Sequence, residues 1–235
     1  MTVVKRIVCL ANSKKPSGRC VAGREILPAG AGPWIRPVSS RPGEEVSENE
    51  RQYEDGSDPK VLDVVDIPLL QHRPHACQTE NWLLDPNQYW RRIRRADWNE
   101  LQTHVENPPT LWINGNSTYH GVHDEIPQAT ADTLPRSLYL IHVPRVDLHV
   151  FAPSEAFGNP KRRVQARFQH AAAQYVLWVT DPYIERNFLA RGDRSYSLGE
   201  CCLTISLGEP YETKGQYYRY KLVAAIIEHG GGATT

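Results

Sequence analysis

Short apolar runs with a period of two, bounded by proline, glycine or asparagine, constrain the fold of this chain more than any other feature. In the segment 161–168 the apolar residues share one parity: Val164, Ala166 and Phe168. The residues of the other parity are polar: Arg163, Gln165 and Arg167. Because successive side chains of a strand point to opposite faces of its sheet, we expect a strand here. One face would lie in a core, and the other would carry a row of guanidinium and amide groups.

Similar runs recur along the whole chain and predict a mainly β protein. The clearest lie at 3–10, 19–24, 34–38, 61–70, 138–143, 147–151, 162–170, 175–180, 201–207 and 218–227. A five-stranded, partly open β-barrel needs about five short strands and often one helix. Two such barrels packed together fit this number of runs, although no internal repeat is visible between the two halves. A single β-sandwich is the alternative architecture.

Two segments depart from this pattern and are predicted to be helical. An insertion around 86–106 contains two helix-like stretches, 86–95 and 98–105, and Asp97 with Glu100 resembles a capping box at the start of the second. Asp181 before Pro182 predicts the start of a short helix near 182–190. The insertion is rich in arginine and tryptophan. It suits either an amphipathic surface helix or a second surface that contacts phosphates and bases.

Charge is distributed unevenly, although the formal net charge of the 235 residues is zero. Residues 1–42 contain eight lysines and arginines and one acid, whereas residues 43–66 contain nine acids and two cations. This asymmetry fits a surface that faces a polyanion beside an acidic one. Two alternatives stay open: the segments neutralise each other, or the acidic loop 44–55 pairs with Arg163 and Arg167.

The composition disfavours several classes of protein. Hydrophobic residues make up 40% of the chain, which is enough for a core, but no stretch approaches the roughly 20 apolar residues that span a bilayer. The N-terminus lacks the apolar region and the cleavage site of a signal peptide. The five cysteines are an odd number without framework spacing. We therefore expect a reduced, cytoplasmic protein without a membrane partner.

Basic residues beside tryptophans are the candidates for a binding site. Guanidinium groups can hold phosphates bidentately, and small barrels of this type bind single strands through a basic groove with aromatic platforms. The candidates in the first half are Arg19, Arg24, Trp34 and Arg36. Those in the second half are Asn159, Lys161, Arg162, Arg163, Gln165, Arg167 and Trp178. Core packing is the alternative role of both tryptophans.

Signals for catalysis and metal binding are weak. Two H-x-x-H spacings, at 72–75 and 120–123, contain residue types that bind zinc but no paired C-x-x-C. The cysteines carry no catalytic signature, and neither a Walker A pattern nor G-x-G-x-x-G occurs. On these grounds we predict no catalytic residue, no metal and no cofactor.

Seven segments together resemble a known family. They are KRIVCLANS (5–13), GRCVAG (18–23), WIRPVS (34–39), NWLL (81–84), FGNPKRR (157–163), LWVTDP (177–182) and LTISLG (203–208). In order and spacing they are similar to the bacterial family of dual OB-containing domain proteins, over most of the chain. The resemblance implies two OB-like barrels, which we place at 1–135, with the acidic loop and the helical insertion, and at 136–229, followed by a flexible tail at 230–235. It also implies binding of nucleic acid or nucleotides and a role in prokaryotic antiviral defence.

Three functions are consistent with the sequence. The first is a non-enzymatic protein that binds nucleic acid, single-stranded in the leading hypothesis, as an accessory factor that delivers a substrate to a partner enzyme. The second is a sensor of a nucleotide or modified nucleoside, bound by the same arginines and a stacked tryptophan. The third is a small metal-dependent enzyme that acts on nucleotides through His120, His123 and Asp124. Affinity that rises with oligonucleotide length, saturable mononucleotide binding, and turnover distinguish the three.

Overall fold

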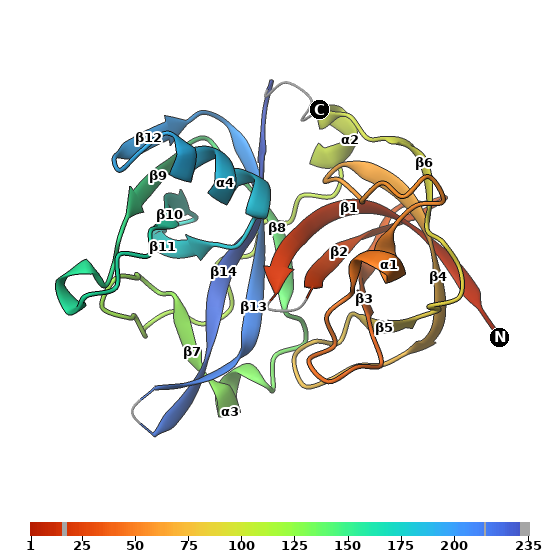
Figure 1. Cartoon of the computed structure of the whole chain (residues 1–235), viewed down its shortest axis with the longest axis horizontal. Coiled ribbons are helices and arrows are strands. Elements are labelled where there is room, and N and C mark those ends of the chain that lie inside the picture. Colours follow the sequence, from red (N-terminus) through yellow and green to blue (C-terminus); the bar gives the residue numbers. More distant parts are fainter. Residues whose placement is uncertain (16–17, 214, 231–235) are drawn as a thin grey trace. The chain divides into compact units, whose positions relative to one another are not determined.

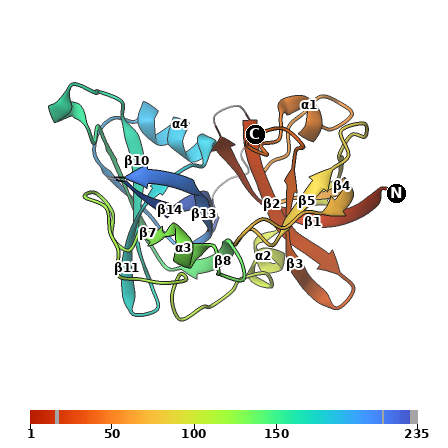
Figure 2. The same cartoon turned by 90° about the horizontal axis from the view of Figure 1, so that it is seen from below.

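The computed structural model describes residues 1–15, 18–213 and 215–230, and it confirms the prediction of a mainly β protein. The chain forms two compact units (Figure 1 and Figure 2). The first comprises Met1–His104 and Pro135–Ser137, and the second comprises Val105–Leu134 and the chain from Leu138 onward. The segment Val105–Leu134, which the sequence assigned to the first barrel, therefore groups with the second unit. The predicted tail lies outside the described residues except for Gly230.

Five strands of the first unit form a closed barrel. They are β1 (Val3–Lys15), β2 (Gly18–Leu27), β3 (Gly30–Val38), β4 (Asp63–His72) and β5 (Asn81–Leu84). Their order is β1-β2-β3-β5-β4, and β4 pairs with β1 to close the ring. All neighbours are antiparallel except β3 and β5, which are parallel. β1 is long enough to pair with β4 through its first half and with β2 through its second half.

β1 and β2 approach each other closely where β1 bends. The register shifts between Cys9 and Ala11, which marks a bulge in β1. A side chain at Gly23 would collide with the carbonyl oxygen of Val8, so this approach requires glycine. The core of the unit is a cluster of buried residues: Ile7, Cys9, Val21, Ile35, Val46, Tyr53, Val65, Ile67, Leu69, Leu84 and Trp90.

The predicted helical insertion is half wrong. Residues Arg91–Arg95 form a strand, β6, which pairs with β4, and only Trp98–Gln102 form a helix, α2. In the register, Asp63 and Asp66 of β4 lie opposite the two end residues of β6. Cross-strand pairs between these carboxylates and arginines stabilise an extended segment that resembled a helix by local pattern alone. A short helix, α1 (Glu48–Arg51), lies in the acidic loop.

The second unit repeats the path of the first. Its barrel strands are β8 (Leu138–Val143), β9 (Val146–Phe151), β10 (Arg163–His170), β11 (Ala173–Val179), β13 (Cys201–Thr213) and β14 (Gln216–Glu228). β10 pairs with β9 and β11, β11 runs parallel to β14, and β13 pairs with β14 and β8. β8 and β9 follow one another in the chain, so together they take the place of the long β1. The two units therefore share one strand order, with the parallel pair in the same place.

Further elements surround the second barrel. They are β7 (Glu125–Pro127), α3 (Gln128–Ala131), the 3-10 turn η1 (Glu155–Phe157), α4 (Pro182–Ala190) and β12 (Ser195–Leu198). α4 confirms the predicted helix near 182–190, and the Asp181 side chain caps it by accepting hydrogen bonds from the amides of Tyr183 and Ile184. β12 extends the sheet beyond β9, and β7 pairs with β14. Among the described residues no helix has the length and apolar character needed to cross a membrane.

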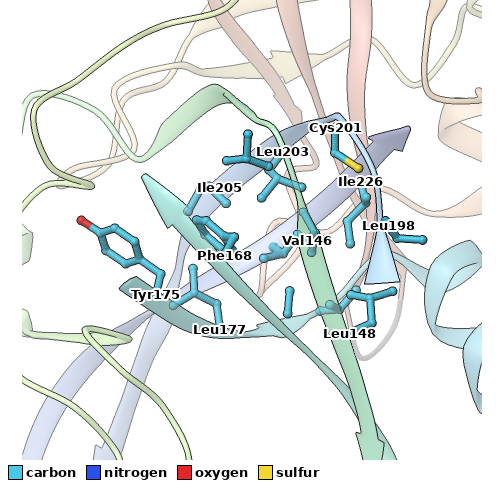
Figure 3. Close-up of a cluster of buried hydrophobic side chains, with 14 of the residues drawn as sticks. Val146, Leu148, Phe168, Tyr175, Leu177, Leu198, Cys201, Leu203, Ile205 and Ile226 are labelled. Atoms are coloured by element: carbon cyan, nitrogen blue, oxygen red, sulfur yellow. The ribbon is translucent and has the colours of Figure 1, made fainter. Parts of the chain in front are cut away.

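The core of the second unit confirms the parity predicted for 161–168. Val164, Ala166 and Phe168 of β10 are buried in one apolar cluster. Figure 3 shows Phe168 beside Leu177 and Val146, between the strands of the barrel. The opposite parity of β10 therefore points outward, and it positions the candidate site.

Candidate functional site

The outward side chains of β9, β10 and β11 form one continuous surface, which we call the β9–β11 face. They are His149, Phe151, Arg163, Gln165, Arg167 and Trp178. The antiparallel register places Phe151 directly opposite Arg163. Gln165 lies between His149 and Trp178 in the next row. Directly opposite side chains of neighbouring strands lie close enough to touch, so the strands themselves assemble this mixed aromatic and cationic surface.

Arg163 stacks on Trp178 at the centre of the β9–β11 face. The guanidinium carbon lies 4.1 Å from the centroid of the indole ring, and the ring of Phe151 stacks on the same indole with a centroid distance of 5.7 Å. Burial lowers the pKa of Arg163, and the negative charge of Glu185 opposes this shift. Among the described residues no carboxylate lies within ion-pair distance of this guanidinium. The site therefore holds a half-buried cation that forms no ion pair with the described residues, and such a cation attracts an anion.

A segment that precedes the barrel in the chain adds two more rings to this surface. The ring of His120 lies 5.5 Å from that of Phe151 and 6.2 Å from that of Trp178, and its Nε2 lies 3.1 Å from the carbonyl oxygen of Pro153. Tyr119 packs edge-on against His120 at 4.8 Å, and 96% of it is exposed. A large ring held in solvent beside other aromatic groups is available for stacking with a planar ligand.

Hydrogen bonds hold this segment against the barrel. The side-chain amide of Gln165 donates to the carbonyl oxygen of His120 at 2.8 Å. The carboxylate of Asp124 is buried and accepts bonds from the amide and the hydroxyl of Thr118, at 2.7 and 2.6 Å. The amide of Lys221 in β14 donates to the carbonyl oxygen of Asp124 at 2.7 Å. Gln165 is only 6% exposed. Because its side-chain amide is bonded to His120, it orients this segment and is not offered to a ligand.

Replacing Gly121 with alanine is expected to loosen the loop that carries Tyr119. The new methyl group would overlap the carboxylate of Asp124, which must then rotate and give up its bonds from Thr118. Leaving these groups unsatisfied should lower the free energy of unfolding by about 1–2 kcal/mol, measured by urea denaturation. Gly199→Ala is the matched control because open space surrounds that position. Equal effects of the two substitutions would contradict this role of Asp124.

The loop between β9 and β10 carries the other candidates of the second half. It projects away from the barrel (Figure 1). Asn159 accepts a hydrogen bond from the amide of Lys161 at 3.1 Å, and Arg162 pairs with Asp193 at 2.8 Å. Lys161 is exposed, and Phe157 at the tip of η1 is 89% exposed. The loop thus presents cations and an apolar ring to solvent, although Asn159 is engaged within the loop itself.

Arg167 lies at the far end of the β9–β11 face from Arg163. Its side chain is exposed. Burial acts to raise the pKa of Asp147, but the hydrogen bonds from Arg145 and Ser197 together with the charges of Arg145 and Arg167 outweigh it and lower that pKa. In the part of the chain that the structure describes, Arg167 forms no ion pair of its own. It therefore adds a positive charge in line with Arg163, opposite Asp147 of β9.

The candidates of the first unit do not form a comparable surface. Arg36 is buried, with one nitrogen 2.9 Å from Glu80 and Nε donating to Asn81 at 2.7 Å. Trp34 is only 6% exposed, and the guanidinium of Arg24 lies 5.7 Å from its ring centroid. Trp34 and Arg36 are therefore buried in the first unit. For Trp34 this agrees with core packing, the alternative role that the sequence left open for the tryptophans.

The acidic loop finds partners in its own unit. Its ion pairs join Glu44 to Arg73, Glu50 to Arg41 and Asp58 to Arg51. Arg19 is half-buried where the backbone of β2 bridges to Val46 of the same loop. Of these three pairs, Glu50–Arg41 joins the acidic segment to residues 1–42, and the pair of Asp66 with Arg6 is a second such contact.

The paired histidines have separate partners. Nε2 of His72 lies 2.6 Å from the carbonyl oxygen of Thr79, and Nδ1 of His123 accepts a bond from the amide of Gly115 at 3.2 Å. Within the described residues no group of three histidine, cysteine or acidic side chains is placed to hold a metal ion. The cysteines there are free thiols, and burial raises the pKa of Cys201 to about 12.

Sequence reasoning assigned four members of the aromatic cluster to no binding surface, although it named His120 as a candidate of the enzymatic alternative. His149 and Phe151 share the parity of Asp147 in a run with buried Leu148 and Val150, so the alternation in β9 could have placed both on the outer face. Tyr119 and His120 carry no such local signal. Contacts with residues more than 30 positions away bring them to the site.

Comparison with known proteins supports the double-barrel architecture. A family model described as a dual OB-containing domain matches residues 5–226, which is nearly the whole chain. Searches of curated proteins and of solved structures each found no match.

Proposed function

Because the chain belongs to the dual OB-containing domain family, we propose that its second unit binds single-stranded nucleic acid across the β9–β11 face. The observation that carries the proposal is the stack of Arg163 on Trp178, a half-buried cation beside an aromatic platform and without an ion pair among the described residues. Phosphate satisfies such a guanidinium, and a base can stack on the neighbouring rings.

The neighbouring groups support an extended ligand. Arg167 continues the row of positive charge along β10, and Lys161 adds to it in the adjoining loop. Tyr119 and Phe157 provide further exposed rings. Stacking tolerates every base because every base has a π-face, so we expect modest sequence preference. The accessory role in prokaryotic defence stays a prediction of the resemblance.

Removing two charges from β10 tests the phosphate contacts. We expect the Arg163→Gln/Arg167→Gln variant to bind a labelled single-stranded oligonucleotide about tenfold more weakly at low salt. The slope of log affinity against log salt should become shallower by about 1.4, since each phosphate contact on a single strand contributes about 0.7. Fluorescence anisotropy across a salt series measures both quantities.

A charge-matched control separates this site from general electrostatics. Lys14→Gln/Lys60→Gln also removes two positive charges, from exposed positions of the first unit. It should leave the oligonucleotide affinity nearly unchanged. The proposal fails if the wild-type chain binds no oligonucleotide at low salt, or if both double variants weaken binding equally.

A nucleotide sensor is the second candidate, and the same stack supports it. One base on Trp178 with one phosphate on Arg163 would fill the centre of the face without using Arg167 or the loop. Affinity that rises with oligonucleotide length favours the strand, whereas equal affinity for a mononucleotide favours the sensor. A thermal shift with mononucleotides alone gives an independent reading, because a ligand that binds the folded state raises the unfolding temperature.

A further inference from the structure

Tyrosine side chains gather on one face of a small sheet that extends beyond the second barrel. β8 pairs with β13 only as far as Ser206, and β11 pairs with β14 only from Leu222 onward, while β7 pairs with the outer part of β14. Figure 1 shows the β13–β14 hairpin projecting from the barrel beside β7. We call one surface of these three strands the tyrosine face. Its residues are Glu125, Pro127, Tyr211, Tyr218 and Tyr220. We propose that the tyrosine face binds a proline-rich segment of a partner protein that carries an arginine or a lysine.

Strand pairing brings these five side chains together. Tyr211 of β13 lies directly opposite Tyr218 of β14, and Pro127 of β7 lies opposite the same tyrosine on its other side. Tyr220 lies two residues further along β14, opposite Glu125, and therefore shares the face. The ring centroids of Tyr211 and Tyr220 are 6.1 Å apart. Side chains at such positions touch across the strands, so they form one continuous surface of rings.

The rings are open to solvent and are already oriented. Tyr211 is 64% exposed. The hydroxyl of Tyr218 donates to the side chain of Gln216 at 2.6 Å, and the hydroxyl of Tyr220 lies 3.0 Å from that of Thr213. A tyrosine that is held in place loses little side-chain entropy when a partner binds, and it offers a large apolar ring with a polar edge.

The opposite face of the same sheet has a partner within the chain. Arg219 is 1% exposed, and it donates to Asp132 at the end of α3 at 2.6 Å. Ile126 of β7 lies opposite Arg219 and is fully buried. The tyrosine face is therefore the side of this sheet that α3 leaves open.

Charge on the tyrosine face favours a cationic partner. Glu125 is half-buried, and burial together with the charge of Asp124 raises the pKa of its carboxyl group. Among the described residues, which exclude Lys214, no lysine or arginine forms an ion pair with this carboxylate. A cation from a partner would stabilise it, whereas a phosphate would be repelled. The charge thus favours a basic protein segment over nucleic acid at this place.

A proline-rich segment suits the surface better than an added strand. Polyproline II is extended and has no internal hydrogen bonds, and aromatic surfaces recognise it at a low cost in backbone entropy. Strand addition would need a regular open edge on β13, but the register shifts between Leu207 and Pro210, and proline has no amide hydrogen to donate. The partner therefore packs on the rings and does not extend the sheet.

Synthetic peptides test this inference without phosphates or bases. The probe is a labelled peptide of about ten prolines flanked by arginines, and the comparison peptide has glutamates in place of the arginines. We expect the full chain to bind the arginine peptide about fivefold more tightly, and Glu125→Gln should remove most of this preference. Tyr211→Leu should weaken binding of the arginine peptide about fivefold through loss of a ring. Fluorescence anisotropy measures these affinities, and thermal unfolding checks that the variants fold.

Two matched controls come from the same hairpin. Glu212 and Tyr217 lie opposite each other on its other face, so Glu212→Gln and Tyr217→Leu should bind the arginine peptide as the wild type does. The proposal is overturned if the wild type binds both peptides equally or neither at millimolar concentration, or if Tyr217→Leu loses as much affinity as Tyr211→Leu. Self-association of the wild type that Tyr211→Leu abolishes, measured by sedimentation, would overturn it in favour of a second copy. Oligonucleotide binding by the β9–β11 face is measured separately, so the proposed function stands or fails independently.

Discussion

Replacing Trp178 with leucine is expected to weaken binding of a single-stranded oligonucleotide by about ten- to a hundredfold. The indole is the central ring of the site, since it contacts the guanidinium of Arg163 and the ring of Phe151. Loss of one base–aromatic stack costs about 1–3 kcal/mol, and each 1.4 kcal/mol corresponds to tenfold in affinity. Leucine keeps much of the apolar volume, so the π-face is the main property that is lost.

Matched variants identify the cause of that loss. Trp178→Phe should recover most of the affinity, because phenylalanine restores an aromatic face. Trp112→Leu removes a tryptophan that packs on Tyr139 of β8 and is not one of the residues of the β9–β11 face, and it should leave binding unchanged. If Trp178→Phe binds as poorly as Trp178→Leu while both unfold at the wild-type temperature, Trp178 acts by packing and not by stacking.

Lys221→Met is expected to remove a rise in stability between pH 7 and pH 9. Lys221 is fully buried, with Nζ donating to the carbonyl oxygen of Ile113 at 2.8 Å and to the side chain of Asn114 at 3.1 Å. Burial lowers the pKa of this amine from 10.5 to about 7, and the charge of Asp124 opposes the shift. The ring of Tyr175 lies 5.4 Å from the amine and also faces it.

The direction of the effect follows from the protons bound in each state. Below the folded pKa of about 7 both states carry the proton, so the contribution of Lys221 does not vary with pH. Above it the folded state loses the proton while the unfolded chain keeps it up to about 10.5, and the free energy of unfolding rises. From pH 7 to pH 9 the wild type should therefore gain about 2 kcal/mol relative to Lys221→Met.

Urea denaturation of both proteins at the two pH values measures this difference. The raised pKa of a buried thiol such as Cys201 lowers stability at alkaline pH. That effect is present in both proteins and cancels in the comparison. Lys221→Gln serves as a second variant if the methionine variant does not fold, and Lys60→Met is the exposed control. An identical pH dependence of the wild type and the Lys221 variants would show that the amine keeps an ordinary pKa.

Local pattern predicted much of the architecture. The alternation in 161–168 identified β10 and its buried parity, and the capping residues before Pro182 identified α4. The order of seven short segments indicated the family, and with it the two barrels. These features were predictable because backbone geometry couples side-chain direction to sequence period and because caps act within one helical turn.

Features that depend on distant partners were predicted less well. The arginines of β6 resembled a helix until Asp63 and Asp66 appeared opposite them in β4. Segment 105–134 gave no sign that it belongs to the second unit, because its anchors, Gln165 and Lys221, lie far along the chain. Pairing across long sequence separations leaves no local periodicity to read.

The sequence alone determined which residue types stand on each face of the strands, because the period of a strand is set by its backbone. Tertiary structure decided which of the cations remain available. It buried Arg36 against Glu80 and committed Gln165 to the carbonyl oxygen of His120. It left Arg163 on the indole of Trp178 without an ion pair in the described part of the chain, because burial and pairing depend on groups that only folding brings within a few ångströms.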